Sequence, residues 1–463
     1  MEILYLLPVL FSALGSLLCI LPFLRFEEDI SVIVSVGALA SAVYILFLPN
    51  YSTNFYYIDG LSKIFLVMIS AIYLGSVIFS IYYVEHIQNK LFQSHFYFFL
   101  LNTFVLTMLF TVILNNLGLI WVAVEATTVT SALLISTEND EATIEATWRY
   151  VIIVSVGLII SLIAVIFIYS SFKTLSFADL LKMHTDSRLA YFGAVLGIIG
   201  FGTKAGIFPM HTWLPDAHGK APSPISAVFS AVLLPVALFA IERVLQAVPN
   251  DGVKVFAFTL GLLSIVLAAL MSFNQVYYKR MFAYSSIDNM GIALIGLSLG
   301  GYAFVGSVLI ILSHAFAKSA TFYLTGNVLI KYNSWKIEEV KGVAKILPVT
   351  GYSLFFGSLA VTGTPPFGTF FGELLILIGI YNTYGTVITL LTGLFLAIAF
   401  IGINYKTISM IFSEPDKLKM SELIPAGKED VTVLVPIINL IIALSVTFAA
   451  PLVYNILFNG IWK

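Results

Sequence analysis

The stretch from Gly200 to Ala227 reads GFGTKAGIFPMHTWLPDAHGKAPSPISA, and it decides how the chain must be arranged. Its first part continues an apolar run typical of a membrane helix, yet it contains Lys204 and then meets Pro209. Proline cannot continue a helix, because it lacks the N–H group and its ring clashes with the preceding turn. Irregular backbone at membrane depth is tolerated only where it is buried in protein or lines a cavity. We therefore predict a membrane helix that is broken beside a lysine.

The composition of the whole chain indicates a membrane protein. Of 463 residues, 59% are hydrophobic and only 10% are charged, against about 25% charged residues in an average soluble domain. The single cysteine, Cys19, excludes an internal disulfide and a cysteine-based zinc or iron–sulfur site. The net charge of -2 gives no general electrostatic reason to bind nucleic acid. The predicted fold class is an all-α polytopic membrane protein embedded in a lipid bilayer.

Apolar runs that could cross a bilayer recur along the chain. A spanning helix needs about 20 predominantly apolar residues, and fourteen such segments are predicted. They are 2–24, 30–48, 61–84, 95–114, 117–136, 148–170, 190–209, 222–244, 253–273, 283–300, 302–330, 348–382, 384–412 and 432–456. Two of them are predicted to be broken helices, because 190–209 ends at Pro209 and 348–382 contains Pro365 and Pro366.

The two broken helices also predict how the chain is organised. Discontinuous helices in corresponding positions are typical of inverted repeats in transporters. We expect helices 1–3 within 1–94, one five-helix repeat in 95–244 and an inverted five-helix repeat in 253–412. The remainder, 413–463, would hold a final helix after the polar stretch 413–431, which either lies on the membrane surface or reaches a neighbouring subunit.

Basic residues in the predicted loops set the orientation of a membrane protein. With both termini outside, thirteen lysine and arginine residues fall in cytoplasmic loops and six fall on the outer side. We therefore expect a multi-pass protein of a cell membrane with both termini outside. The low content of cysteine and glutamine favours a thermophilic source.

Two titratable residues of the first half lie within predicted helices. A charged residue at a helix centre costs roughly 2.5–3.5 kcal/mol on insertion scales, and such residues are usually functional. Glu125 lies in the middle of 117–136, and Lys204 precedes the break at Pro209. A proton-carrying role is favoured for both residues. The alternatives are that Glu125 only holds helices together and that Lys204 reaches the membrane interface.

The second half of the chain carries a further set of titratable residues. His314 and Lys318 are spaced i, i+4, so they share one helix face and could pass a proton between them. Glu373 follows the second break and supplies an acidic group there. His218, in the predicted loop after the first break, could admit protons, because histidine titrates near neutral pH, or could simply cap the next helix. Asp288 is interpreted as a cap or a structural contact at a helix start.

The sequence contains no recognisable cofactor site. It has no phosphate-binding glycine loop, no dinucleotide fingerprint and no histidine cluster at metal-ligand spacing. We therefore expect no ATP, NAD, haem or metal, and no catalytic residue in this chain. Protons, other ions or lipid-soluble molecules are the expected cargo.

Taken together, these segments resemble the antiporter-like membrane subunits of respiratory complex I, of group 4 membrane-bound hydrogenases and formate hydrogenlyases, and of Mrp cation/proton antiporters. The Gly200–Ala227 stretch matches the most characteristic motif of that family. The other matching pieces, in order over about 55–412, are WVAVEATT, IEATWRYVII, YKRMFAYSSIDNMG, SHAFAKSATFYLTGN and GTPPFGTFFGELL. WVAVEATT and APSPISA are most similar to the hydrogenase-linked branch.

The resemblance implies a central hydrophilic axis halfway through the membrane. It also implies a subunit that moves protons or sodium ions in a prokaryotic redox-driven complex, together with other membrane subunits as partners. The matching positions are Glu125 for the fifth-helix glutamate, Lys204 for the broken-helix lysine, His314 and Lys318 for the bridging residues, and Glu373 for the exit-side residue. In this mechanism, a change in the charge of Glu125 would shift the pKa of Lys204. The proton would then leave through His314, Lys318 and Glu373.

One position departs from the family pattern. Members close to complex I carry a lysine in the eighth helix where this chain has Pro235. Proline cannot take a proton, and we expect it to bend that helix. The path from Lys204 to Lys318 would then need His218, water or another route.

Three functions are compatible with the sequence. The first is an ion-translocating subunit of an oxidoreductase complex, of the membrane-bound hydrogenase or NADH/ferredoxin dehydrogenase type. The second is a subunit of an Mrp-type multi-subunit cation/proton antiporter. The third is a membrane scaffold that anchors a redox arm without transport. The charges inside the membrane favour the first two functions.

Overall fold

Apolar helices make up most of the computed structural model, which describes residues 2–21, 26–87, 90–415 and 431–459. The helices of the first half are α1 (Glu2–Cys19), α2 (Glu27–Leu46), α3 (Gly60–Glu85), α4 (Ser94–Thr111), α5 (Leu117–Ile135), α6 (Glu141–Phe172), α7 (Phe177–Leu180), α8 (Arg188–Ala205), α9 (Trp213–Lys220), α10 (Ser223–Val228), the π-helical turn η1 (Phe229–Leu233) and α11 (Leu234–Ala247). Between α2 and α3, β1 (Tyr51–Ser52) pairs antiparallel with β2 (Tyr57–Ile58).

The second half is also helical. Its elements are α12 (Asp251–Ser272), α13 (Tyr278–Leu299), α14 (Gly301–Tyr332), α15 (Val343–Ile346), α16 (Pro348–Val361), α17 (Gly368–Tyr384), α18 (Thr386–Phe412), η2 (Val431–Val433), α20 (Leu434–Ser445), η3 (Val446–Ala449), α21 (Ala450–Tyr454) and η4 (Asn455–Asn459). The polar stretch predicted at 413–431 falls mostly on 416–430, which lie outside the described residues.

Twelve helical segments within the described residues are long and apolar enough to cross a membrane. This confirms the predicted all-α polytopic membrane protein. The predicted count of fourteen is not reached in this way, because the other two predicted segments, 190–209 and 348–382, are the broken ones. Irregular backbone separates α8 from α9 and α16 from α17.

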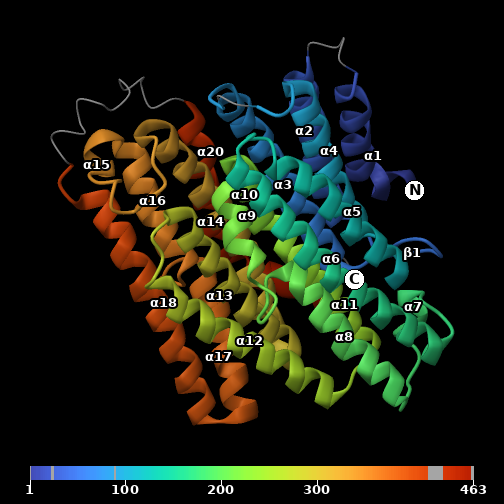
Figure 1. Cartoon of the computed structure of the whole chain (residues 1–463). Coiled ribbons are helices and arrows are strands. Elements are labelled where there is room, and N and C mark those ends of the chain that lie inside the picture. Colours follow the sequence, from blue (N-terminus) through green and yellow to red (C-terminus); the bar gives the residue numbers. More distant parts are fainter. Residues whose placement is uncertain (1, 22–25, 88–89, 416–430, 460–463) are drawn as a thin grey trace.

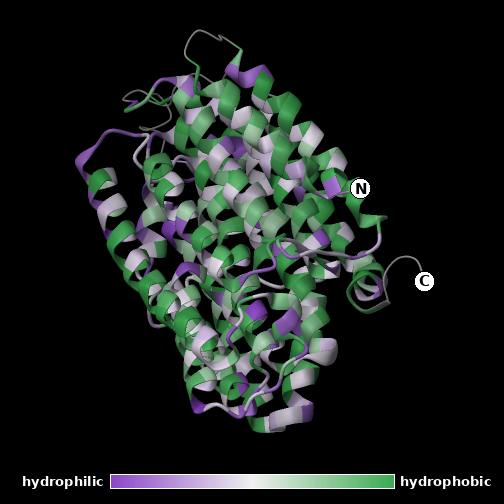
Figure 2. Ribbon diagram, turned by 90° about the vertical axis from the view of Figure 1, so that its right-hand side faces the viewer, coloured by the Kyte–Doolittle hydropathy of each residue, from purple (hydrophilic) through white to green (hydrophobic). Residues whose placement is uncertain are grey.

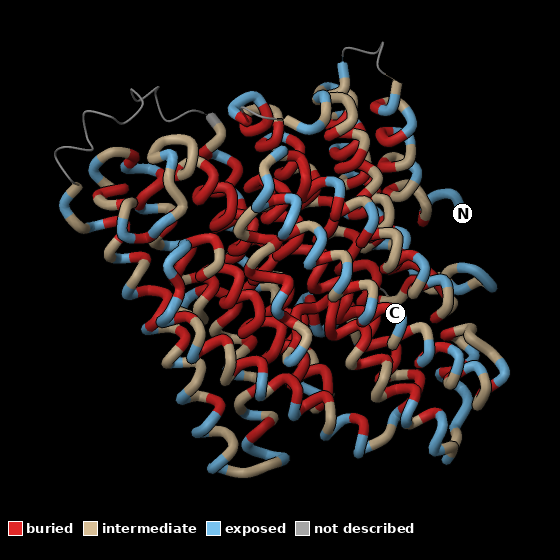
Figure 3. The backbone as a smooth tube through the Cα atoms, viewed as in Figure 1, coloured by how far each residue is buried: buried red, intermediate tan, exposed pale blue. Residues whose placement is uncertain are grey.

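The helices form one bundle with exposed flanks and a buried middle. In Figure 1, α1, α2 and α4 lie at one flank, α17 and α18 lie at the other, and α10, α13 and α14 lie between them. The segment from α10 to α11 and helix α13 are almost completely buried, whereas α1, α2 and α18 turn most of their residues outward (Figure 3). The middle of the bundle can therefore hold charged groups away from lipid.

The distribution of polar residues agrees with a bundle that crosses a bilayer. Figure 2 shows hydrophobic residues along the helices and hydrophilic residues gathered in the loops, with a smaller number between the helices. Isolated backbone bridges hold loops at each end together. The bridges are Tyr56–Leu114 and Asn116–Ser176 at one end, and Lys90–Glu138 and Tyr277–Lys336 at the other. The first two join loops predicted to be outside and the last two join loops predicted to be cytoplasmic, while the orientation itself stays a prediction.

The first broken helix ends earlier than the proline that was expected to break it. α8 stops at Ala205, four residues before Pro209, and Gly206 follows with a left-handed φ of 75°. A Cβ at Gly206 would also collide with Leu214. Other residues rarely adopt this conformation, so glycine is favoured here. The predicted break is therefore confirmed, but a glycine cap ends the helix rather than Pro209.

The second broken helix is built in a similar way. α16 ends at Val361, Gly363 has a left-handed φ of 66°, and α17 begins at Gly368. The hydrogen bond from the Thr364 N–H to the Leu359 carbonyl, at 3.2 Å, closes the end of α16. Both breaks therefore follow a glycine in a conformation that other residues rarely adopt.

The structure places Asp288 and His218 differently from the sequence interpretation. α13 begins at Tyr278 rather than at 283, which places Asp288 well inside the helix and not at its start. The predicted loop after the first break contains helix α9, and Pro215 lies in the first turn of α9, where its missing N–H is not needed. Asp288 and His218 are therefore helical residues, and the two predictions that placed them at a cap or in a loop were wrong.

Candidate functional site

Lys204 lies fully buried in the last turn of α8. Its Nζ donates to Thr128 Oγ1 of α5 at 2.9 Å and to the Tyr150 hydroxyl of α6 at 2.6 Å. α6 can approach Lys204 closely because glycines, which have no side chain, lie at its contact with α8. A Cβ at Gly157 would collide with Thr203, and one at Gly200 would collide with Ser161. Close backbone packing at small residues thus places the lysine between three helices.

Glu125 lies on α5, one turn before Thr128, and its side chain is half-buried. Its Oε2 is buried without a hydrogen-bond partner among the described residues. It interacts electrostatically with Lys204, although the described ion pairs do not include a direct contact between the two. The structure therefore brings these two predicted residues together as a separated charge pair, with hydroxyl groups holding the ammonium.

Lys318 lies fully buried near the middle of α14. Its Nζ donates to the Phe282 carbonyl and to Ser285 Oγ, both on α13. His314, one turn earlier on α14, is also fully buried, and its Nε2 lies 3.3 Å from the Ser230 carbonyl of η1. The predicted placement on one helix face is confirmed, but the two side chains reach different neighbouring helices.

His218 lies on the inner side of α9 and is fully buried. Its ring stacks on Phe322 of α14 with ring centroids 4.9 Å apart and an interplanar angle of 9°. Neither of its ring nitrogens has a hydrogen-bond partner among the described residues. Because Phe322 is one turn beyond Lys318 on α14, His218 lies beside the Lys318 site and interacts electrostatically with that lysine.

Glu373 lies on α17, directly after the second break, and is half-buried. Its carboxylate packs against Gly363, where a Cβ would collide with both of its oxygens. Glu125 and Glu373 are thus carboxylates on helices of opposite flanks of the bundle (Figure 1), whereas the lysines and histidines between them are fully buried.

Asp288 belongs with these residues, although the sequence interpretation placed it at a helix start. It is 5% exposed on α13, one turn after Ser285, and its Oδ1 has no hydrogen-bond partner among the described residues. It interacts electrostatically with both Lys318 and Glu373. Its neighbour Asn289 donates to the Val361 carbonyl at the end of α16, at 2.9 Å. Ser285 and Asp288 both lie in the predicted segment 283–300, so their i, i+3 spacing was already visible in the sequence.

Tyr150 is the second residue that the sequence interpretation missed. It lies in the matching piece IEATWRYVII, is fully buried, and its hydroxyl lies 2.5 Å from Ser131 Oγ as well as close to Lys204. A buried tyrosine hydroxyl usually finds a polar partner, so a tyrosine near the predicted lysine was a usable signal. The ring of Tyr150 packs against Trp213 and Phe229, with centroids 4.8 and 6.1 Å apart. Ring contacts continue from Phe229 to His218 and from His218 to Phe322 beside Lys318, so aromatic rings lie between the two lysine sites.

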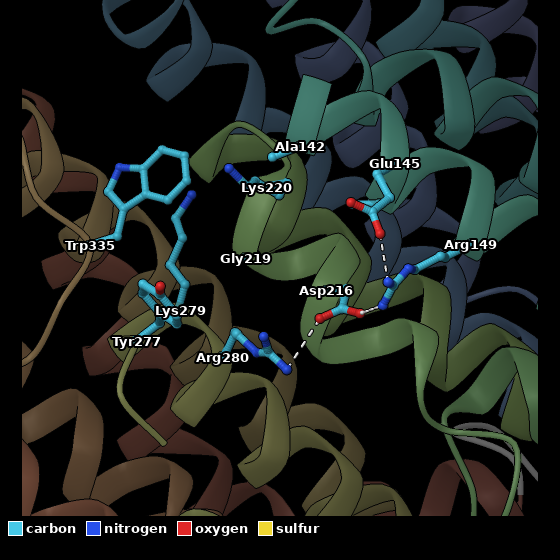
Figure 4. A pocket seen from close by; sticks show the side chains of 11 residues that line it. Ala142, Glu145, Arg149, Asp216, Gly219, Lys220, Tyr277, Lys279, Arg280 and Trp335 are labelled. Carbon is cyan, nitrogen blue, oxygen red and sulfur yellow. Dashed lines mark hydrogen bonds and ion pairs between the residues drawn. The ribbon is translucent and has the colours of Figure 1, made fainter. Parts of the chain in front are cut away.

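A cleft of about 380 Å³ opens beside α9 at the end of the bundle with the loops predicted to be cytoplasmic. In Figure 4, Asp216 lies between Arg149 and Arg280, with ion-pair distances of 3.4 and 3.2 Å. Lys220 lies over the Trp335 ring, 4.3 Å from its centroid. One face of α9 therefore lines a charged cleft, while its buried histidine faces the interior of the bundle.

A second cleft, of about 350 Å³, shares Trp335 with the first and is lined by Glu138 from the loop between α5 and α6. Burial raises the pKa of the Glu138 carboxyl, and the nearby positive charges of Lys279 and Lys220 offset this only in part. A carboxyl group with a raised pKa gains and loses protons closer to neutral pH. The loops at this end can thus hold an exchangeable proton near α9.

Comparison with known proteins decides the family. Residues 115–399 match the family model described as NADH:quinone oxidoreductase/Mrp antiporter, TM. The chain belongs to this family. The hydrogenase-4 component F homologue of Methylacidiphilum infernorum is 33% identical over 391 residues, covering 80% of this chain and 82% of the homologue. Hydrogenase-4 component B of Escherichia coli is 27% identical over 332 residues, 68% of this chain and 49% of that protein. These relatives confirm the resemblance to the hydrogenase-linked branch.

Solved structures show the same fold at lower identity. A chain of the membrane-bound sulfane sulfur reductase, an archaeal respiratory membrane complex, has a TM-score of 0.85 at 23% identity, over 98% of this chain and 96% of that chain. A chain of the Mrp complex from Dietzia sp. DQ12-45-1b has a TM-score of 0.86 at 17% identity, over 99% of this chain and 98% of that chain. The architecture is therefore shared by redox-linked and antiporter complexes.

Proposed function

We propose that this chain translocates protons as a membrane subunit of a redox-driven, hydrogenase-type complex. The hydrogenase-4 component F homologue overlaps 80% of this chain and 82% of its own length, and the chain carries the buried groups that a proton path needs. One observation supports the proposal most. The buried lysines Lys204 and Lys318 both donate to uncharged oxygen atoms, and each interacts electrostatically with a carboxylate that it does not contact directly. An ammonium group that is not locked in a direct ion pair can lose its proton when the nearby charge changes.

The proposed path runs from flank to flank through the middle of the bundle. A charge change in a neighbouring subunit alters Glu125, and this changes how strongly Lys204 holds its proton. The proton moves past His218 to His314 and Lys318. Water has to bridge the aromatic rings between the two lysine sites, because no described hydrogen bond crosses them.

Exit from the path involves the carboxylates of the second half. Asp288 receives the proton from Lys318 and Glu373 passes it on at the opposite flank. Replacement protons enter through the second cleft, whose lining includes Glu138, a group that can exchange protons with water. The cytoplasmic side of this cleft, both termini outside and a thermophilic prokaryotic source are parts of the proposal that rest on the sequence.

The domain division is also part of the proposal. In the predicted repeat 95–244, α6 packs closely on α8 through Gly157 and Gly200; in the predicted repeat 253–412, α14 packs closely on α17 through Gly306 and Gly372, where an added Cβ would press on the facing backbone. Two close glycine contacts beside two broken helices support an inverted five-helix repeat. Each lysine site has a link to a break: Lys204 lies in the last turn of α8, and α13, which holds Lys318, is bonded through Asn289 to the end of α16. Freed backbone groups and water can be accommodated at such breaks.

The test uses the complete purified complex in lipid vesicles, with electron transfer started by adding reductant. We expect protons to accumulate on one side in proportion to the electrons transferred, in sodium-free medium. Proton movement that requires sodium would favour the second candidate, a cation/proton antiporter subunit, which the similarity to the Mrp complex structure keeps open. Electron transfer without movement of either ion would leave only the scaffold function and would contradict the proposal.

A further inference from the structure

The π-helical turn η1 lies directly before Pro235 in a segment that is otherwise α-helical from Ser223 to Ala247. In this turn the Leu234 N–H bonds to the Phe229 carbonyl, five residues back, as a π-helix requires. In the same register, the next donor would be the N–H of residue 235 and the acceptor would be the Ser230 carbonyl. Proline has no N–H group, so residue 235 leaves this carbonyl free for another donor.

His314 takes the place of the missing donor. Its Nε2 lies 3.3 Å from the Ser230 carbonyl. A carbonyl oxygen only accepts hydrogen bonds, so Nε2 must carry the proton, and in the neutral ring Nδ1 then keeps its lone pair. Nδ1 is buried and has no hydrogen-bond partner among the described residues. The free carbonyl therefore selects one of the two tautomers of the ring.

The ring of His314 lies among elements of both halves of the bundle. Lys318 on the same helix and His218 from α9 are the charged and titratable groups that interact electrostatically with the ring. On the other side of the carbonyl, the Ser230 hydroxyl lies 2.7 Å from Ser286 Oγ of α13, which ties η1 to that helix. The acceptor is therefore held in place from α13 while the ring comes from α14.

We propose that Pro235 and η1 act as a positioning device that holds His314 as its Nε2–H tautomer, so that Nδ1 is the atom that accepts and releases the transported proton. This rests on the proposed function. The sequence indicated Pro235 as a gap in the path. In this proposal, Pro235 frees the Ser230 carbonyl, this carbonyl orients His314, and His314 carries the proton. No bond between heavy atoms changes: Nδ1 gains a proton from one side and loses one to the other.

The substitution Pro235→Ala tests this, because it adds an N–H group that competes for the Ser230 carbonyl. The complete complex is prepared with ¹⁵N-labelled histidine, and the difference between its solid-state NMR spectrum and that of His314→Gln isolates the His314 signals. We expect a protonated Nε2 and an unprotonated Nδ1 in the wild type, and a mixture of tautomers in Pro235→Ala. Redox-driven proton uptake should fall by about tenfold or more, since a wrongly oriented proton carrier loses most of its effect.

Two further variants separate positioning from folding. Pro224→Ala changes a proline in the first turn of α10, where no N–H is needed, and should leave both the spectrum and the uptake unchanged. His314→Gln keeps an N–H donor for the Ser230 carbonyl but cannot carry a proton, so uptake should be lost while the complex remains assembled.

Three results would overturn the inference while leaving the proposed function intact. They are a wild-type His314 protonated at Nδ1 instead of Nε2, an unchanged His314 spectrum in Pro235→Ala, and a changed spectrum with full proton uptake. The first needs only the wild type and the His314→Gln reference spectrum, so it decides the question even if Pro235→Ala does not assemble. Failure of the proposed function would look different, because the wild-type complex itself would then move no protons.

Discussion

The Lys204 and Lys318 sites hold the same group in two different ways. At the first site, hydroxyl groups from two helices hold the ammonium, and the carboxylate that acts on it, Glu125, is half-buried at the flank of the bundle. At the second site, a backbone carbonyl and a serine of a single helix hold the ammonium, and Asp288 on that same helix is fully enclosed.

This difference indicates which site responds to a neighbouring subunit. The charge state of Lys204 depends on a carboxylate that a partner can approach at the flank, so an external charge can change it. The charge state of Lys318 depends on an internal carboxylate that such a partner does not reach. We infer that the first site receives the signal and the second site responds to the arriving proton.

The largest expected effect concerns Asp288, the internal carboxylate of the second site. In Asp288→Asn, Lys318 loses the negative charge that interacts with it, and the path loses a proton acceptor. We expect redox-driven proton uptake to fall by about 100-fold, at the low end of the range for losing a positioned proton-transfer group. The measurement is proton uptake per electron in vesicles with the complete complex.

A matched control for this prediction is Asp251→Asn, at the exposed start of α12. It removes the same charge from the same half of the chain, and it should not change uptake. If Asp288→Asn pumps as well as Asp251→Asn, then the second site does not depend on an internal carboxylate and the comparison between the two sites fails.

A smaller effect should come from the hydroxyl groups that hold Lys204. Tyr150→Phe removes one of them. A hydrogen bond to a charged group is worth about 1.5 kcal/mol at the lower end of its range, and because Thr128 still holds Lys204 we expect this lower end, roughly tenfold in proton uptake. Ser285→Ala should have less effect at the second site, because the Phe282 carbonyl still holds Lys318. Initial uptake rates of the two variants, measured side by side, check this order. The reverse order would show that the hydroxyls matter more at the second site.

The smallest expected effect is on the stability of the fold. It concerns the ion pair between Arg243 and Asp59, which lies outside both lysine sites. Arg243, which is 1% exposed, donates from Nη1 and Nη2 to the two carboxylate oxygens of Asp59 at 2.7 and 2.8 Å, and it packs against the rings of Tyr57, Phe177 and Phe239. Burial raises the pKa of Asp59, but the Arg243 guanidinium and the Ser62 hydrogen bonds outweigh it, and the pKa lies below its ordinary value of 3.8.

The sign of the pH effect follows from this lowered pKa. A carboxyl whose pKa is lower in the folded state stabilises the fold above its unfolded pKa and loses that contribution as the pH falls through the folded value. The Tm of the purified complex should therefore fall below about pH 4 more steeply in the wild type than in Asp59→Asn, which starts from a lower Tm. Parallel pH profiles for the two proteins would exclude a stabilising role for this ion pair.

The fold could be predicted from the sequence because the bilayer imposes a simple length rule on apolar segments. Most predicted segments correspond to described helices, and both predicted breaks exist. The errors come from positions where polar residues continue a helix. Tyr278–Tyr284 and Trp213–Lys220 are helical although they are not apolar, because they pack against other helices rather than against lipid.

The candidate site could be predicted only in part. Glu125, Lys204, His314, Lys318 and Glu373 stand out because each interrupts an apolar run. Tyr150 and Asp288 did not stand out, since the first looks like an ordinary aromatic and the second was assigned to a helix end. The contact between His314 and the Ser230 carbonyl depends on the register of a π-helical turn, which no local pattern in the sequence specifies.

The central claim is that Lys204 carries the transported proton, and one comparison tests it most directly. Lys204→Met is measured against Lys63→Met, which removes another buried lysine of a spanning helix, one that donates to the Leu48 carbonyl at 2.6 Å and interacts electrostatically with Asp59. With the complete complex in vesicles, we predict that Lys204→Met transfers electrons but takes up almost no protons, whereas Lys63→Met retains wild-type proton uptake per electron. Full proton uptake in Lys204→Met would contradict the account.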